Sequence, residues 1–301
     1  MLPEETKKEL EERQYRFVGN HSAVRTCNWL KESLRCDDVC YKQKFYGIES
    51  HRCLQMTPAL LCNQRCLHCW RDTSFFSSEW EGPVDDPEEI IDGCIEAQRE
   101  LISGFGGNEE VSEKKLEEAK KPNQAAISLT GEPMFYPRIS ELIEEFHERD
   151  FTTFLVTNGT FPERIEKLEE LPTNLYVSLE APNRELYREH CRPVEEDSWG
   201  KLQKTLELVG DLGTTSVLRI TCMEGVNMDL PDEFAELADK AGFDYVEAKA
   251  YMHIGYSQKR LPRKTMPSHE DVRKFAGEIA ENSNYNVKDE QERSRVVLLN
   301  K

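Results

Sequence analysis

Three cysteines, Cys62, Cys66 and Cys69, stand close together in the segment CNQRCLHCW. Thiolate-only ligation favours zinc or an iron–sulfur cluster, and both normally take four protein ligands. His68 lies inside the Cys66–Cys69 turn, where its side chain is poorly placed to reach the same metal. The motif therefore predicts a metal centre in which one ligand position is left open.

A second group of cysteines lies upstream, where Cys27, Cys40 and Cys53 are spaced by 13 and 13 residues. We interpret them as ligands of a second cluster, whose open iron would hold a small chelating substrate. Buried free thiols are the alternative reading. Cys36 competes for one of the three places because it forms a C-x3-C pair with Cys40.

A lysine follows this second group, since Lys42 stands two residues after Cys40. An amine in a cationic or desolvated setting can lose its proton and form a Schiff base with a carbonyl substrate. Lys42 is therefore the candidate nucleophile, and Lys44 is its nearest competitor. A solvated surface lysine is the alternative.

Six β-rich runs alternate with helical patterns, which is typical of parallel strands joined by helical crossovers. The first helix is expected to have Asp86 as its N-cap and Pro87 in its first position, and the polar segment 106–123 is expected to be an exposed insertion. Roughly 190 residues separate Cys53 from Gly242, whereas a complete eight-fold barrel needs about 250 residues. We expect an α/β fold, a partial (β/α)6 TIM-like barrel with an N-terminal extension. The predicted strands are 53–61, 125–129, 152–157, 174–180, 215–221 and 244–249.

Polar or metal-binding residues follow each of these strands. In barrels of this kind the chemistry collects at the C-terminal ends of the strands, although each of these residues could also be an ordinary solvated strand end. The candidates are the Cys62 trio, Gly131 with Glu132, Asn158, Ser178 with Glu180, Arg219 with Thr221, and Glu247 with Lys249.

The C-x3-C-x2-C motif after the first of six βα units resembles that of the radical S-adenosylmethionine superfamily. The resemblance implies a [4Fe–4S] cluster held by Cys62, Cys66 and Cys69, with S-adenosylmethionine on the open iron. One electron then cleaves the cofactor, and a 5′-deoxyadenosyl radical abstracts hydrogen from the substrate. The segment TGEP resembles the Gly-Gly-Glu motif of that superfamily, with Thr130 in place of the first glycine. The implied cofactor contacts are Gly131, Glu132, Asn158, Ser178 and Arg219.

Longer stretches resemble the archaeal tRNA 4-demethylwyosine synthases: CYKQKFYGIESHRC, SLTGEP, YVSLEAP, LRITCMEGVNM and VEAKAYMHIGYSQKRL. This resemblance implies that N1-methylguanosine-37 of tRNA-Phe gains two carbons from pyruvate, with loss of formate, as the third ring closes. It implies that Cys27, Cys40 and Cys53 bind a second [4Fe–4S] cluster, and that Lys42 forms the Schiff base with pyruvate. Eukaryotic relatives carry a flavodoxin-like domain, which is not found in this sequence. We therefore expect an external electron donor of flavodoxin or ferredoxin type.

The net charge of −18 argues against indiscriminate nucleic-acid binding. Two basic segments, 42–45 and 257–264, are the candidate contacts for the tRNA anticodon loop, because basic residues interleaved with aromatics suit an unstacked RNA base. Solvated surface charge is the alternative for both.

The chain shows neither a run of roughly 20 apolar residues nor a signal peptide. We expect a cytoplasmic monomer without membrane contact, whose ten cysteines serve as metal ligands or plain thiols.

Residues 1–52 are expected to form an N-terminal extension that supplies second-cluster ligands, and residues 53–301 the radical barrel with a C-terminal extension. Two competing functions remain open: a radical enzyme with another substrate, and a zinc-stabilised tRNA-binding module without catalysis.

Overall fold

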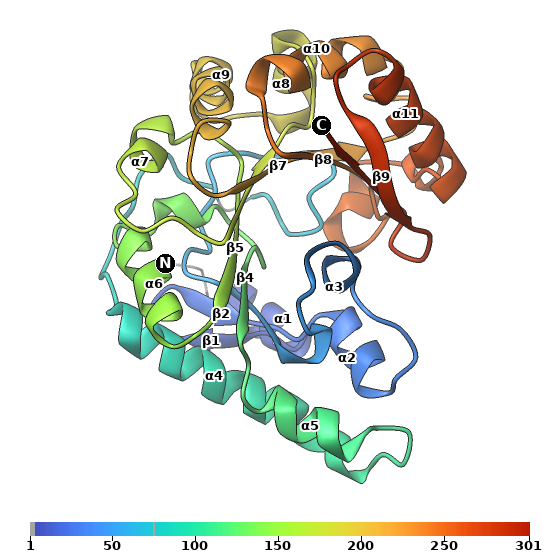
Figure 1. Cartoon of the computed structure of the whole chain (residues 1–301). Coiled ribbons are helices and arrows are strands. Elements are labelled where there is room, and N and C mark those ends of the chain that lie inside the picture. The colour runs from blue at the N-terminus through green and yellow to red at the C-terminus, as the bar shows by residue number, and fades with distance from the viewer. Residues whose placement is uncertain (1–3, 75) are drawn as a thin grey trace. The chain divides into compact units, whose positions relative to one another are not determined.

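The computed structural model describes residues 4–74 and 76–301 (Figure 1). The chain divides into two compact units. The first unit comprises the residues up to Leu61, residues 79–156 and residues 168–173. The second unit comprises residues 62–78, 157–167 and 174–301.

The first unit contains three parallel strands and an antiparallel hairpin. Leu54 of β3 lies opposite Ala125 of β4, and Ala125 lies opposite Thr153 of β5. The hairpin joins the sheet through Ala23, which lies opposite Thr57. Apolar side chains on both faces of the parallel strands are buried, as expected for strands covered on both sides. The strands are β1 (Arg16–Val18), β2 (Ser22–Val24), β3 (Cys53–Thr57), β4 (Gln124–Ile127) and β5 (Thr152–Thr157).

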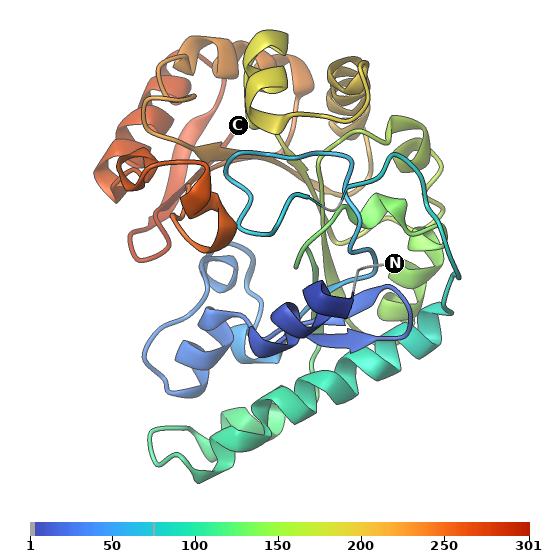
Figure 2. The same cartoon turned by 180° about the vertical axis from the view of Figure 1, so that it is seen from behind.

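The longest helix of this unit, α4, starts as predicted, because the Asp86 side chain accepts a hydrogen bond from Glu88 N at 3.0 Å and Pro87 follows. It packs against β1, β2 and β3, and Figure 2 shows it running along the hairpin. The expectation that 106–123 is an exposed insertion is wrong in part, since Leu116 of α5 is buried in a core with Leu30 and Leu34. The helices are α1 (Glu4–Glu12), α2 (Asn28–Leu34), α3 (Tyr41–Tyr46), η1 (Ser50–Arg52), α4 (Pro87–Ser103), η2 (Gly104–Gly107), α5 (Glu113–Ala119), η3 (Pro133–Phe135) and α6 (Ile139–Glu148).

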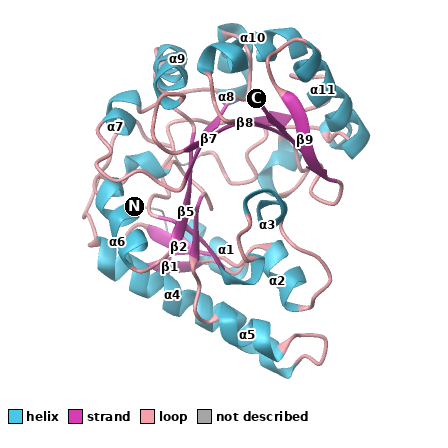
Figure 3. Ribbon diagram, in the orientation of Figure 1, coloured by secondary structure: helices cyan, strands magenta, loops and turns pink. Residues whose placement is uncertain are grey.

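The second unit also contains three parallel strands, β6, β7 and β8, with β10 and β9 added antiparallel. Leu218 of β7 lies between Val177 and Val246, and Leu298 of β10 lies opposite Glu247. Helix α11 packs against α10, β8, β9 and β10 (Figure 3). The strands are β6 (Asn174–Ser178), β7 (Thr215–Cys222), β8 (Tyr245–Ala250), β9 (Asn286–Gln291) and β10 (Val296–Asn300). The helices are α7 (Pro162–Glu166), α8 (Arg184–Cys191), α9 (Ser198–Val209), α10 (Pro231–Ala241), η4 (Gly255–Lys259), η5 (Arg263–Thr265) and α11 (His269–Glu281).

The predicted alternation of six strands with helices is confirmed by β3 to β8, although β3 ends at Thr57 rather than at residue 61. The four antiparallel strands were not predicted. Among the described residues, no helix is long and apolar enough to cross a membrane.

Candidate active site

The cysteine loop, Cys62 to Ser78, lies in the second unit and is held by backbone hydrogen bonds to the end of α8. The amides of Arg65 and Leu67 donate to the carbonyls of Cys191 and His190 at 3.0 and 2.9 Å. Val194 N donates in return to Asn63 O at 2.9 Å. The loop is therefore fixed along the chain that leaves α8.

The three thiols of this loop surround one buried guanidinium. Arg71 is 9% exposed and its Nη2 donates to Gln64 O at 3.1 Å. Burial alone would lower the pKa of Arg71, but the sulfur atoms of Cys62, Cys69 and Cys66 raise it overall. The charge of Arg71 favours the deprotonated, metal-binding form of these thiols, although contact with Cys191 and burial raise the pKa of Cys66 overall and burial raises that of Cys69. This donor set fits an iron–sulfur cluster with three protein ligands.

In neither cysteine trio do all three sulfur atoms lie close enough together to bind one zinc ion. Donor atoms at about 2.3 Å from a tetrahedral zinc ion lie about 3.8 Å from one another. Within the described part of the chain, the one group of three His, Cys, Asp or Glu residues whose ligand atoms all lie within 4.8 Å is Glu49, His51 and Glu118. An iron–sulfur cluster does not require its thiolates to lie that close together, because each thiolate binds a different iron.

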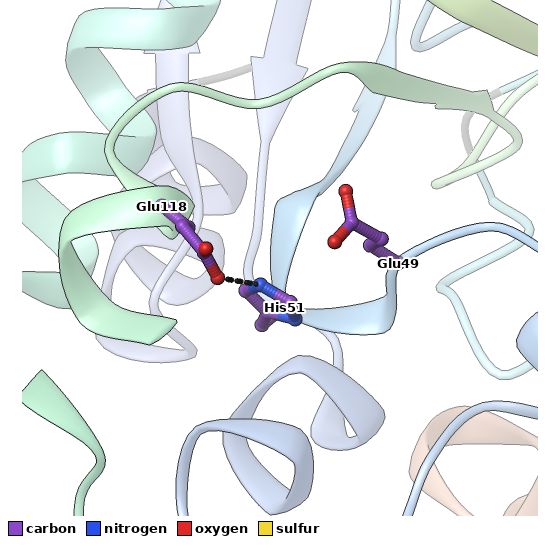
Figure 4. Close-up of side chains that lie close together, drawn as sticks. All are labelled: Glu49, His51 and Glu118. Atoms are coloured by element: carbon purple, nitrogen blue, oxygen red, sulfur yellow. Dashed lines mark hydrogen bonds and ion pairs between the residues drawn. The ribbon is translucent and has the colours of Figure 1, made fainter. Parts of the chain in front are cut away.

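The Glu49, His51 and Glu118 group sits just ahead of Cys53 and has local partners (Figure 4). His51 Nε2 lies 2.8 Å from the carboxylate of Glu118, which lowers the pKa of Glu118. Glu49 accepts a hydrogen bond from Arg52 at 3.0 Å. These contacts tie α5 to η1, so we assign the group a structural role.

Arg260 clamps the cysteine loop from a distant part of the second unit. Its guanidinium donates to the carbonyls of Leu67 at 3.1 Å, Cys69, and Arg71 at 3.2 Å. Its Nη1 also donates to Thr73 Oγ1 at 3.1 Å. Beside this clamp, Tyr256 N donates to Trp70 O at 2.8 Å.

Three predicted cofactor contacts lie in the same unit as the cysteine loop. Asn158 Nδ2 donates to Asn63 Oδ1 at 2.9 Å and lies 3.9 Å from Cys62 Sγ. Arg219 forms an ion pair with the fully buried Glu247 at 2.7 Å. Ser178 ends β6 directly opposite Arg219.

Gly131 and Glu132 lie in the first unit, at the end of β4. Gly131 has φ +73°, and a Cβ there would lie 2.0 Å from Ala59 O, so only glycine fits. Glu132 N donates to Leu61 O at 2.7 Å, and the Glu132 side chain caps η3 through Met134 N at 3.0 Å. The segment is thus fixed by its backbone.

The second cysteine trio comes together in the first unit, because each member stands at the start of an element. Cys27 caps α2, Cys40 precedes α3 and Cys53 opens β3. Burial raises the pKa of the Cys53 thiol, and the nearby Cys27 and Cys40 raise it further, while the charge of Lys42 opposes them. The three sulfur atoms and the lysine are therefore neighbours.

The structure separates the lysine and cysteine competitors. Lys42 is 7% exposed, and its Nζ lies 4.5 Å from the centre of the Phe154 ring. Lys44 and Cys36 are both exposed. Of Lys42 and Lys44, Lys42 is therefore the lysine beside the second cysteine trio, and Cys40 rather than Cys36 is the cysteine that belongs to it.

The two basic segments present fewer surface charges than expected. Lys42 is buried, so segment 42–45 exposes only Lys44 as a cation. In segment 257–264 Arg260 is bound to the cysteine loop, which leaves Lys259, Arg263 and Lys264 exposed.

The contacts of Arg71 and Arg260 were not predicted from the sequence. The position of Arg71, directly after the cysteine motif, is a signal that could have identified it. Arg260 lies 193 residues beyond Leu67, and no local pattern indicates the contact.

Comparison with known families places the site in a class. Residues 56–238 match the model of the radical SAM superfamily, and residues 240–301 match the model of wyosine base formation. Fold and cysteine loop together define a radical S-adenosylmethionine enzyme with a partial barrel of the TIM type.

Individual relatives show which family of radical S-adenosylmethionine enzymes the chain is similar to. A tRNA 4-demethylwyosine synthase of Pyrococcus abyssi is 50% identical over 99% of this chain and 89% of its own. A structure of TYW1 with a lysine–pyruvate adduct bound has a TM-score of 0.90 at 39% identity, covering 100% of this chain and 96% of that one. The crystal structure of archaeal TYW1 has a TM-score of 0.83 at 35% identity, with the same coverage. The chain belongs to the family of S-adenosylmethionine-dependent tRNA 4-demethylwyosine synthases, which use S-adenosylmethionine and a radical SAM [4Fe–4S] cluster.

Proposed function

We propose that the chain converts N1-methylguanosine-37 of tRNA-Phe to 4-demethylwyosine, with pyruvate as the donor of two carbons. The observation that carries this proposal is the burial of Lys42 among Cys27, Cys40 and Cys53. A TYW1 relative with a lysine–pyruvate adduct supports it, since its fold matches this chain along its whole length.

In this proposal Lys42 is the pyruvate-binding nucleophile. Its neutral amine adds to the ketone carbon of pyruvate, and loss of water leaves the carbon–nitrogen double bond of a Schiff base. Cys27, Cys40 and Cys53 would hold a second [4Fe–4S] cluster, and pyruvate would be held by the lysine, by an iron of that cluster, or by both. Two pyruvate carbons enter the new ring, and the third leaves as a carboxyl radical anion, which one electron from the external donor and one proton convert to formate.

The cysteine loop carries the other half of the proposed chemistry. Cys62, Cys66 and Cys69 hold the radical cluster, which supplies a 5′-deoxyadenosyl radical from bound S-adenosylmethionine. Gly131 and Glu132 receive the methionyl amino group through their backbone. Asn158, Ser178 and Arg219 contact the ribose and the carboxylate, and Arg219 must share that role with its ion pair to Glu247.

The partners follow from the same chemistry. An external flavodoxin or ferredoxin supplies the electrons, and the tRNA anticodon loop presents its base unstacked. Lys259, Arg263 and Lys264 are candidate tRNA contacts. We propose a cytoplasmic monomer in which residues 1–52 form the N-terminal extension and residues 53–301 the barrel with its C-terminal extension.

Borohydride trapping with labelled pyruvate tests the central role of Lys42. Wild type should retain the label on the peptide that contains residue 42, and Lys44→Ala, the matched control, should retain it equally. Lys42→Ala should lose the label, and Lys42→Arg should not restore it, because a guanidinium stays protonated. Equal labelling of wild type and Lys42→Ala would exclude Lys42 as the nucleophile.

A further inference from the structure

Helix α8 carries a row of exposed arginines on a strongly acidic protein. Arg184, Arg188 and Arg192 are four residues apart, so they lie along one side of the helix and its C-terminal end. All three are exposed, although the chain as a whole has a net charge of −18. Such a row concentrates positive charge where the average surface would repel an anion.

A hollow beside this row contains a further arginine from the cysteine loop. Its volume is about 510 Å³, and Arg65 lines it together with Arg188 and Arg192. The Arg65 guanidinium lies 4.6 Å from the ring centre of Phe76, which is 41% exposed. An arginine stacked on an exposed aromatic ring offers both a phosphate ligand and a platform for a base.

Acidic neighbours do not cancel this charge. Glu195 and Glu196 also line the hollow. Glu195 is paired with Lys201, so its charge is met by a cation outside the row. Of the two acidic residues that line the hollow, this leaves Glu196, whose single negative charge is smaller than the combined positive charge of Arg65, Arg188 and Arg192.

The backbone of Arg192 adds an independent observation. It caps α8 with φ +47° and ψ +57°, the left-handed conformation that favours glycine or asparagine. An arginine at this position costs stability, and its Nε donates a long hydrogen bond to Glu189 O at 3.3 Å. A strained backbone at a residue points to a use for its side chain, and the side chain of Arg192 lines the hollow.

We propose that Arg65, Arg184, Arg188 and Arg192, with Phe76, bind the phosphate backbone of the tRNA substrate and a neighbouring unstacked base. Planar guanidinium groups match phosphate oxygens in pairs, and the exposed ring favours RNA over an acidic protein partner. Arg65 stands between Cys62 and Cys66, so the bound backbone lies next to the radical cluster loop. This inference rests on the proposed tRNA substrate.

Salt-dependent tRNA binding to the reconstituted full chain tests this surface. The triple variant Arg184→Gln/Arg188→Gln/Arg192→Gln should lower the slope of log affinity against log salt by about 2, at roughly 0.7 per lost phosphate contact. The control Lys240→Gln/Arg273→Gln/Lys274→Gln changes the net charge equally on exposed residues of the same unit and should bind like wild type. An unchanged slope in the triple variant would overturn the inference.

Arg192→Gly separates binding from folding. Glycine relieves the left-handed backbone, so the melting temperature should stay equal or rise while tRNA affinity falls severalfold. A variant with equal tRNA affinity would contradict the role given to this side chain. Loss of reduction by flavodoxin with unchanged tRNA binding would reassign the surface to the electron donor. Turnover of tRNA by wild type, reduced with dithionite, decides the proposed function separately.

Discussion

Arg260→Gln should loosen the cysteine loop without touching a thiol. The guanidinium donates to three loop carbonyls, those of Leu67, Cys69 and Arg71. A protein hydrogen bond contributes about 1 kcal/mol net, so losing three costs about 3 kcal/mol of local stability. At about 1.4 kcal/mol per tenfold change, the loop should open roughly 10²-fold more often.

Two measurements on the reconstituted enzyme test this magnitude. Amide hydrogen exchange in residues 67–71 and release of iron to a strong chelator should both accelerate roughly 10²-fold. Arg260→Lys, which keeps the charge but lacks the planar fork, should fall between wild type and Arg260→Gln. Arg263→Gln is the control, since it removes an exposed cation three residues away. Wild-type rates in Arg260→Gln, or equal acceleration in Arg263→Gln, would refute the clamp.

Three further predictions follow from the same contacts. Wild type should hold about eight iron atoms, and a triple alanine variant of either cysteine trio should hold about four. The two variants replace Cys27, Cys40 and Cys53 or Cys62, Cys66 and Cys69. Loss of all iron from either variant would contradict two independent clusters. Gly131→Ala places a Cβ 2.0 Å from Ala59 O, so it should lower the free energy of unfolding by at least about 2 kcal/mol. Gly277→Ala places its Cβ in open space within α11, so it should raise that free energy by about 0.5–1 kcal/mol. Chemical denaturation compares the two. Lys259→Gln/Arg263→Gln/Lys264→Gln should weaken tRNA binding at low salt, and unchanged affinity would return these residues to ordinary surface charge.

Local patterns were sufficient for the parallel core. Each strand from β3 to β8 is a buried β-rich run. Asp86 caps the start of α4 and Gly242 caps the end of α10, as their residue types predict. The hairpin β1–β2 has only three residues in each strand, too few for an alternating pattern. Strand β9 is rich in charge, and its pairing with β10 depends on tertiary contact.

The sequence was sufficient to name candidate site residues but not to predict the contacts between them. Spacing and motif resemblance pointed to both cysteine trios and to Lys42. The burial of Lys42 depends on Phe154 of β5, more than a hundred residues away, and the clamp by Arg260 depends on a still longer contact. Burial and long-range hydrogen bonds arise from packing, so neither is visible in a short segment.

The most direct test of the proposed reaction is an analysis of its products. Anaerobically reconstituted enzyme is given tRNA-Phe that carries N1-methylguanosine-37, S-adenosylmethionine, a reductant and carbon-13 pyruvate, and the nucleosides are then separated by mass. We expect a tricyclic nucleoside that has gained two labelled carbons, together with one labelled formate. Cleavage of S-adenosylmethionine with the methylguanosine left unchanged would contradict it.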